Sequence, residues 1–185
     1  MFVLDPNIVL GIDPGLTRCG YAVIESNGKS VRAIALGVIR TPPSDPLPQR
    51  LASLRHELAA LIAQYKPGAV AVEQVFFQTN VRTAMSVGQA SGLALAEAAA
   101  MGCDVAQYTP SQVKDTVAGW GGANKAQVQR MVQTRLSLAV APNPPDAADA
   151  AALALCHLAA APMRRRVVAA QLQAAQRQAN RAVAR

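Results

Sequence analysis

Four acidic residues occupy positions from which their side chains could meet. Asp13 ends a short apolar run, Glu73 ends another, and Asp146 and Asp149 stand three residues apart in the first turn of a predicted helix. A spacing of three places both carboxylates on one helix face. Because the chain has only 11 acidic residues among 185, these positions are informative. We expect all four carboxylates to converge at one edge of a sheet.

Each of these acids also has an ordinary structural interpretation. Asp13 opens an Asp-Pro-Gly turn, where Asp is favoured without any chemistry. Glu73 fits a solvated strand end, and Asp146 and Asp149 suit the positive end of a helix dipole. For each residue alone the structural interpretation is the more common one, so the functional hypothesis depends on all four occurring together.

A cluster of carboxylates needs cations, because the like charges otherwise repel one another. Mg²⁺ or Mn²⁺ suits such hard oxygen ligands. Two ions held ~4 Å apart can activate a water and stabilise the leaving oxygen of a phosphodiester. They would also cancel the charge of four carboxylates, so that the site would attract DNA instead of repelling it.

The elements that must position these acids follow from apolar runs and from helical periodicity. Strands are predicted over residues 8–13, 19–26, 31–41, 69–73 and 104–108. Helices are predicted over residues 47–65, 80–101, 110–118, 124–138 and 146–161. Three strands joined by tight turns, one of them at Asn27-Gly28, form an antiparallel meander, and crossover helices lead to the other two. The order predicts an α/β fold, a mixed five-stranded sheet with helices on both faces.

The positive charge of the chain is concentrated at its end. The net charge is +7, yet residues 164–185 hold six arginines and no acid, while residues 1–163 have 12 basic and 11 acidic residues. We therefore divide the chain into a domain over 1–163 and an Arg-rich basic tail over 164–185, expected to be a basic helix or a disordered arm. Any polyanion site in the near-neutral body must be local.

Cysteine spacing and the pattern of apolar residues indicate the compartment. Cys19, Cys103 and Cys156 are far apart and form no CxxC pair, which favours neither a disulfide framework nor a zinc site. The N-terminus lacks the pattern of a signal peptide, and no uncharged apolar run approaches the ~20 residues of a membrane span. We expect a cytoplasmic protein without membrane contact.

A set of ordered motifs resembles the RuvC-type Holliday junction resolvases. Each motif is weak alone, but the ordered set from about residue 8 to 160 is highly specific. The motifs are Gly11-Ile12-Asp13-Pro14-Gly15 with Gly20-Tyr21, Glu73-Gln74-Val75-Phe76, Gly88-Gln89-Ala90, Ser111-Gln112-Val113-Lys114, Lys125-Ala126-Gln127-Val128-Gln129 and Asp146-Ala147-Ala148-Asp149-Ala150.

This resemblance implies a ribonuclease H-like fold, a homodimer and two-metal hydrolysis. Asp13, Glu73, Asp146 and Asp149 would hold two Mg²⁺ ions in each active site, with Mn²⁺ as a possible substitute. The implied activity is that of a structure-selective endonuclease, which resolves four-way junction DNA by paired symmetric nicks during recombination and repair. The ends would be 5′-phosphate and 3′-hydroxyl, and the RuvA and RuvB branch-migration proteins are implied partners.

The resemblance also implies DNA contacts. Lys114 and Lys125, two of only four lysines, match lysines that contact DNA near the cut, and we place them in the catalytic set. Phe76 matches an aromatic that touches junction bases, and a second aromatic, Phe77, follows it directly. Stacking of aromatic side chains on bases is worth ~1–3 kcal/mol per base. Their structural alternatives are solvated lysines and aromatics packed in the core or dimer. One departure is Ser91, where family members often have Arg.

Three other functions fit part of the pattern. An actin-like ATPase shares the Gly11–Gly15 type of loop but needs a second lobe and a second nucleotide motif, and the sequence offers neither. A related ribonuclease H-like nuclease, such as one that cuts RNA–DNA hybrids, would use the same acids without the lysine pair or the Phe76 motif. A non-catalytic junction-binding protein would not need all four acids.

Overall fold

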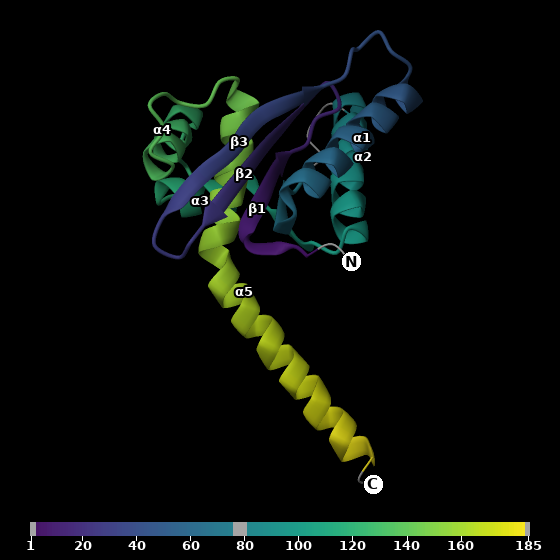
Figure 1. Cartoon of the computed structure of the whole chain (residues 1–185), viewed down its shortest axis with the longest axis vertical. Coiled ribbons are helices and arrows are strands. Elements are labelled where there is room, and N and C mark those ends of the chain that lie inside the picture. The colour runs from purple at the N-terminus through teal and green to yellow at the C-terminus, as the bar shows by residue number, and fades with distance from the viewer. Residues whose placement is uncertain (1–2, 76–80, 184–185) are drawn as a thin grey trace.

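Five strands form a single mixed sheet in the computed structural model, which describes residues 3–75 and 81–183 (Figure 1). The first three strands pair as an antiparallel meander, and the last two run parallel to β1. The order across the sheet is β3-β2-β1-β4-β5. The strands are β1 (Asp5–Asp13), β2 (Arg18–Ser26), β3 (Val31–Arg40), β4 (Pro67–Glu73) and β5 (Asp104–Tyr108). The predicted mixed five-stranded sheet is confirmed.

Helices cover both faces of the sheet, as predicted (Figure 1). Because side chains alternate along a strand, Leu10 and Ile12 of β1 pack with α1 and α2, whereas Val9 belongs to the core on the other face. That second core includes α3, α4 and the first part of α5. The helices are α1 (Leu47–Tyr65), α2 (Val81–Ala100), α3 (Pro110–Ala118), α4 (Lys125–Arg135) and α5 (Pro145–Val183).

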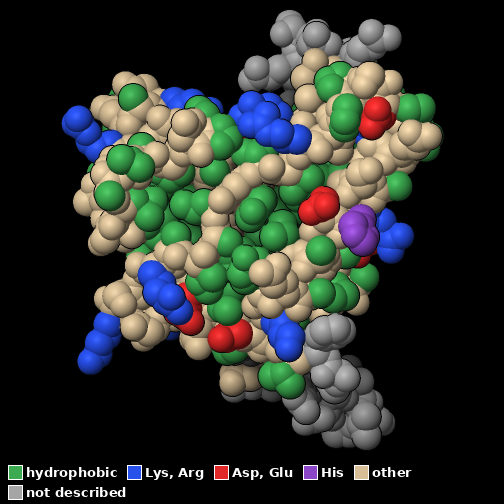
Figure 2. Space-filling model, turned by 45° about the horizontal axis from the view of Figure 1, so that its top comes forward, with side chains coloured by type: hydrophobic (Ala, Val, Ile, Leu, Met, Phe, Trp, Pro, Cys, Tyr) green, Lys and Arg blue, Asp and Glu red, His purple; other side chains and the backbone are tan. Residues whose placement is uncertain are grey.

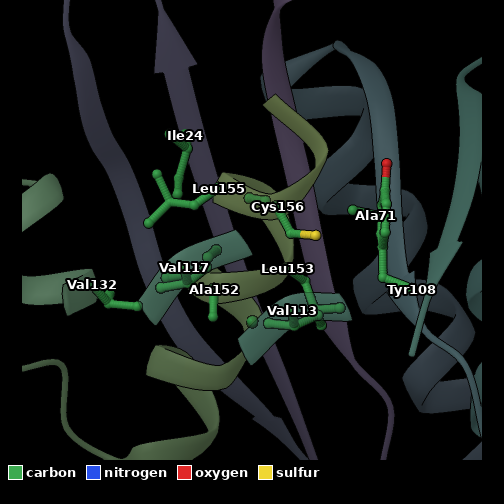
Figure 3. Packing of buried hydrophobic residues seen from close by; sticks show 14 of the residues in the cluster. Ile24, Ala71, Tyr108, Val113, Val117, Val132, Ala152, Leu153, Leu155 and Cys156 are labelled. Atoms are coloured by element: carbon green, nitrogen blue, oxygen red, sulfur yellow. The ribbon is translucent and has the colours of Figure 1, made fainter. Parts of the chain in front are cut away.

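The first part of α5 lies between the sheet and the two shorter helices α3 and α4. Figure 3 shows Leu155 beside Ile24 of β2 and Ala152 near Val117 of α3. Residues 147–148 and 150–156 are all buried, and most of them are alanine. Small side chains let this helix come close to the strands, so the carboxylates in its first turns are held against the sheet edge.

Two helix ends differ from their predictions. The last helix does not stop near residue 161 but continues through Pro162 to Val183, and its second half leads away from the body (Figure 1). Ala, Arg and Gln are strong helix formers, and they outweigh the cost of one proline. Of the two alternatives for the tail, the structure contains the helix. The helix predicted over 124–138 ends already at Arg135, because Ser137 adopts a positive φ of 51°.

The surface agrees with a near-neutral body. On the face in Figure 2, hydrophobic side chains occupy the middle, and Lys and Arg side chains stand apart from one another around it. Positive charge on this face is therefore not a continuous patch. Within residues 3–75 and 81–183, no helix has both the length and the apolar character that crossing a bilayer requires.

Candidate active site

The ends of β1 and β4 bring the first two acids together. The two strands are parallel neighbours with Ile12 opposite Val72, so that Asp13 and Glu73 follow at the same edge of the sheet. The Gln74 N–H donates to the Tyr108 carbonyl at 2.8 Å, which continues the pairing of β4 with β5 beyond Glu73. Asp13 and Glu73 are close enough that each carboxyl group acts on the pKa of the other.

Two glycines allow the start of α5 to lie directly on β1 and β2. A Cβ atom on Gly11 would stand 2.0 Å from the Ala150 carbonyl oxygen, and one on Gly20 would stand 2.2 Å from the Asp146 carbonyl oxygen. Both neighbours are backbone atoms, so no side chain fits at either position. This close approach places Asp146 and Asp149 near enough to Asp13 to act on its charge.

Burial and mutual repulsion favour a proton on this cluster. Burial, followed by the negative charges of Glu73, Asp149 and Asp146, raises the pKa of Asp13 from 3.8 to about 8. Burial also raises the pKa of Glu73, although the hydrogen bond from Asp13 acts in the opposite direction. The site therefore favours positive charge, whether it comes from a proton or from a cation.

Basic side chains hold the two acids of α5. The Arg18 guanidinium forms an ion pair with Asp146, with Nε 3.1 Å from Oδ2 and Nη2 also bonded to that oxygen. Burial raises the pKa of Asp146, but the bonds from Arg18 outweigh it and leave that pKa below its ordinary value. Lys125 Nζ lies 2.6 Å from Asp149 Oδ2, and this bond raises the pKa of Lys125.

A cavity of about 270 Å³ joins three of the acids with both predicted lysines. Asp146, three residues before Asp149 in the first turn of α5, is not part of the lining. The cavity thus combines acids that can bind cations with amines that can bind phosphate. Its lining residues are Asp13, Glu73, Pro110, Val113, Lys114, Lys125, Val128, Asp149, Ala152 and Leu153.

Capping boxes fix the two helices that carry the lysines. At the start of α3, Thr109 Oγ1 accepts from the Gln112 N–H at 3.1 Å, and Gln112 Oε1 accepts from the Thr109 N–H at 2.9 Å. At the start of α4, Asn124 exchanges the same pair of bonds with Gln127, at 3.0 and 2.8 Å. Lys125 is the first residue of α4, so its backbone is set by this cap.

The donor set fits a hard divalent cation, although the side chains are not arranged around one. Among the described parts of the chain, no three Asp, Glu, His or Cys side chains are grouped closely enough to hold an ion as they stand. Asp146 and Asp149 are instead bonded to Arg18 and Lys125. A cation would relieve the repulsion that raises the pKa of Asp13, and carboxylate oxygens are suitable ligands for it.

Sequence reasoning missed Arg18 and gave no structural role to Gly11 and Gly20. Arg18 lies five residues after Asp13, and a basic residue so close to a predicted ligand was a usable signal. Its partner Asp146 is 128 residues away, a pairing that no local pattern indicates. Phe76 and Phe77, the predicted base-contacting residues, lie outside the residues that the structure describes.

Known proteins resemble the chain over most of its length. Residues 9–157 match the family described as crossover junction endodeoxyribonuclease RuvC. The RuvC of Salinispora arenicola is 52% identical over 163 residues, covering 88% of this chain and 93% of the relative. That of Syntrophomonas wolfei is 51% identical over 150 residues, covering 81% and 87%.

Solved structures agree with this family. The structure of Thermus thermophilus RuvC is 38% identical, with a TM-score of 0.79, and covers 84% of this chain and 96% of its own. The same protein in complex with a Holliday junction substrate gives a TM-score of 0.80 over 84% of this chain and 95% of its own. The predicted ribonuclease H-like fold is thereby confirmed. The chain belongs to the RuvC family of crossover junction endodeoxyribonucleases, which are metal-dependent nucleases.

Proposed function

We propose that this chain resolves four-way DNA junctions by cutting at the cavity lined by Asp13, Glu73 and Asp149. The observation that carries this proposal is that these acids share the cavity with Lys114 and Lys125 in a RuvC-family fold. The Thermus thermophilus relative has been determined with a Holliday junction substrate, which supports junction DNA as the substrate here. Paired symmetric nicks with 5′-phosphate and 3′-hydroxyl ends are the expected products.

In this mechanism Asp13, Glu73, Asp146 and Asp149 hold divalent cations. When bound, two Mg²⁺ ions, or Mn²⁺ in their place, would activate the attacking water and stabilise the leaving oxygen. To hold a cation, Asp13 would have to be ionised, and Asp149 would have to release Lys125. The negative charges of the carboxylates would then be balanced by the cations.

Lys125 is the side chain best placed to meet the phosphate. Its side chain is 62% exposed, and an exposed ion pair of this kind is worth only ~0–1 kcal/mol. Lys125 can therefore leave Asp149 for a phosphate oxygen at little cost and stabilise the charge that develops there. Lys114 lines the same cavity from α3 and adds a second positive charge.

Replacing Lys125 by Ala should slow junction cleavage by ~10²-fold or more, because a charge-stabilising donor is removed from the transition state. Junction binding should weaken by less than about tenfold, since one phosphate contact among many is removed. The measurements are single-turnover cleavage and binding without divalent cation. Lys29→Ala, which removes the same charge from the exposed turn between β2 and β3, is the matched control. Equal losses in cleavage and binding would contradict the assignment.

Two nicks placed symmetrically require two active sites. A four-way junction has near two-fold symmetry, so a homodimer would present one cavity to each of two strands. Phe76 and Phe77 are proposed to contact bases at the junction centre, and the RuvA and RuvB branch-migration proteins are proposed partners. A protein that sediments only as a monomer at micromolar concentration would remove the basis for paired nicking.

The second half of α5 is proposed to add sequence-independent affinity for DNA. Six arginines follow Met163, with no acid among them. A chain that ends at Met163 should therefore show a shallower dependence of junction binding on salt, by ~0.9 in the logarithmic slope for each phosphate that the arginines would otherwise neutralise. The measurement is the dissociation constant at several salt concentrations from about 50 to about 200 mM. An unchanged slope would mean that the tail does not contact DNA.

The decisive experiment compares three labelled substrates. A four-way junction, a linear duplex of the same sequence and an RNA–DNA hybrid are incubated with the protein, with and without Mg²⁺. Paired nicks on the junction alone, and only with metal, are expected. Cleavage of the hybrid would favour a related ribonuclease H-like nuclease, and metal-independent binding without any nicks would favour a non-catalytic junction binder.

A further inference from the structure

A second cavity, of about 420 Å³, differs in character from the acidic one. Two arginines and three hydroxyl side chains contribute to its lining, and none of the described residues that form it is acidic. Arg18 belongs to this lining and also bonds Asp146, one of the four predicted metal ligands. The lining residues are Gly15, Leu16, Thr17, Arg18, Arg50, Thr83, Ser86 and Val87.

Arg50 is held in this cavity by a short chain of hydrogen bonds. Its Nε donates to Thr41 Oγ1 at 3.0 Å, and its Nη2 donates to Thr17 Oγ1 at 2.7 Å. Thr41 Oγ1 in turn donates to the Leu16 carbonyl at 2.5 Å, and Thr41 is buried. The guanidinium is thus fixed before any ligand arrives. These bonds use two of its five N–H donors, and no described residue accepts from the other three.

We propose that this second cavity binds a backbone phosphate of the DNA strand whose neighbouring phosphate is cut. The inference rests on the proposed function and deepens it. A guanidinium presents a planar pair of donors that suits phosphate oxygens, and a fixed one loses little entropy on binding. The hydroxyls of Thr17, Thr83 and Ser86 are donors of the kind that commonly contact phosphate.

The position of the cavity favours a strand over a free anion. Arg18 lines it and is bonded to Asp146, and Gly15 of its lining lies two residues after Asp13, so a strand held at the acids would extend toward it. Phosphate contacts fix the register of a protein on nucleic acid without reading sequence. We therefore assign Arg50 a positioning role: it sets which phosphodiester reaches the acids.

The test measures junction binding by the non-cleaving Asp13→Asn protein from about 50 to about 200 mM salt, with Arg50→Gln added. Binding should weaken about tenfold, and the logarithmic salt slope should fall by ~0.9, the value for one phosphate contact. Arg32→Gln is the matched control, because Arg32 pairs with Glu25 at the other end of the β2–β3 hairpin. In the cleaving protein, Arg50→Gln should also spread nicks over neighbouring phosphodiesters. A salt slope equal to that of Arg32→Gln would overturn the proposal.

Further variants separate positioning of DNA from support of the fold. Arg50→Lys keeps a charge for phosphate but loses the fork that bonds Thr17 and Thr41, so it should retain most of the salt slope. If Arg50 only braces the fold, both variants lower Tm and neither changes the slope. Thr83→Glu places an acid at the exposed start of α2, where the helix tolerates it, and should weaken binding about tenfold. Ser30→Glu, in the β2–β3 turn, is its control, and equal effects of the two would contradict the cavity.

Free phosphate and the whole function are tested separately. Inorganic phosphate at matched ionic strength should raise the Tm of the wild type no more than that of Arg50→Gln. The proposal would be overturned by a larger rise in Tm for the wild type together with an unchanged salt slope of junction binding in Arg50→Gln. That result would indicate a site for free anions. If the wild-type chain neither binds nor nicks junctions, the proposed function fails. If it does both and Arg50→Gln behaves as Arg32→Gln does, only the phosphate cavity fails.

Discussion

Replacing Asp13 by Asn should lower junction cleavage by about 1000-fold or more while leaving the protein folded. Asn keeps the size of the side chain but removes the charge that would bind a cation. Loss of a charged group that acts on the transition state typically costs ~10²–10³-fold, and a cation site depends on several such groups at once. The measurement is single-turnover nicking of a labelled junction in Mg²⁺.

The same substitution should stabilise the metal-free protein at alkaline pH. The pKa of Asp13 is about 8 in the folded chain, against an ordinary value of 3.8. Between these values the folded protein keeps a proton that the unfolded chain has lost, so the free energy of unfolding falls as pH rises. The raised pKa of Glu73 acts in the same direction. Asn has no proton to lose, and the advantage of the variant grows with pH up to about 8.

Thermal melting in the presence of a chelator checks this expectation. At pH 9 the variant should exceed the wild type by at least ~1 kcal/mol, which is ~2–4 °C for a chain of this size. At pH 5 the difference should be much smaller, because most of the interval between 3.8 and about 8 lies above that pH. Added Mg²⁺ should raise the Tm of the wild type through linkage and that of the variant much less. Asp115→Asn, an exposed change on α3 outside the cavity, should show neither effect. An Asp13→Asn protein that melts below the wild type at every pH would refute the account.

The meeting of Asp13 and Glu73 was predictable because it depends on short-range rules. Each residue ends a run of buried strand residues, and parallel neighbouring strands end at one edge of the sheet. The spacing of Asp146 and Asp149 was equally local, since three residues along a helix return to the same face. From these rules the sheet, its edge and the acidic residues at that edge could be predicted.

The bonds that these acids form in the folded chain were not predictable in the same way. The bonds of Arg18 to Asp146 and of Lys125 to Asp149 join residues 128 and 24 positions apart, and they depend on how α5 packs against β2 and α4. The length of α5 was missed for an opposite reason. Pro162 is a local signal for a helix end, but the strong helix formers around it outweigh that signal.

Replacing Gly11 by Ala should disrupt both stability and catalysis, although the change adds only one methyl group. The new Cβ would lie 2.0 Å from the Ala150 carbonyl oxygen and 3.0 Å from the Ala154 nitrogen. Neither atom can move unless α5 moves as a whole, because both belong to the helix backbone. The helix must therefore shift away from β1, and its buried alanines separate from the sheet. We expect a loss of ~3 kcal/mol or more, which corresponds to ~6–12 °C in Tm.

That shift would also move Asp149 away from Asp13. Displacements of about 1 Å can cost ~10²-fold in rate, so cleavage should fall at temperatures where the variant is still folded. Gly88→Ala is the control, because a Cβ there meets nothing within 4 Å and Ala favours the α2 helix by ~1 kcal/mol. If Gly11→Ala had the same Tm and the same cleavage rate as Gly88→Ala, the close packing of α5 on β1 would not be what holds the acids together. The strand ends alone would then have to position them, since Asp13 and Glu73 would still be neighbours without the helix.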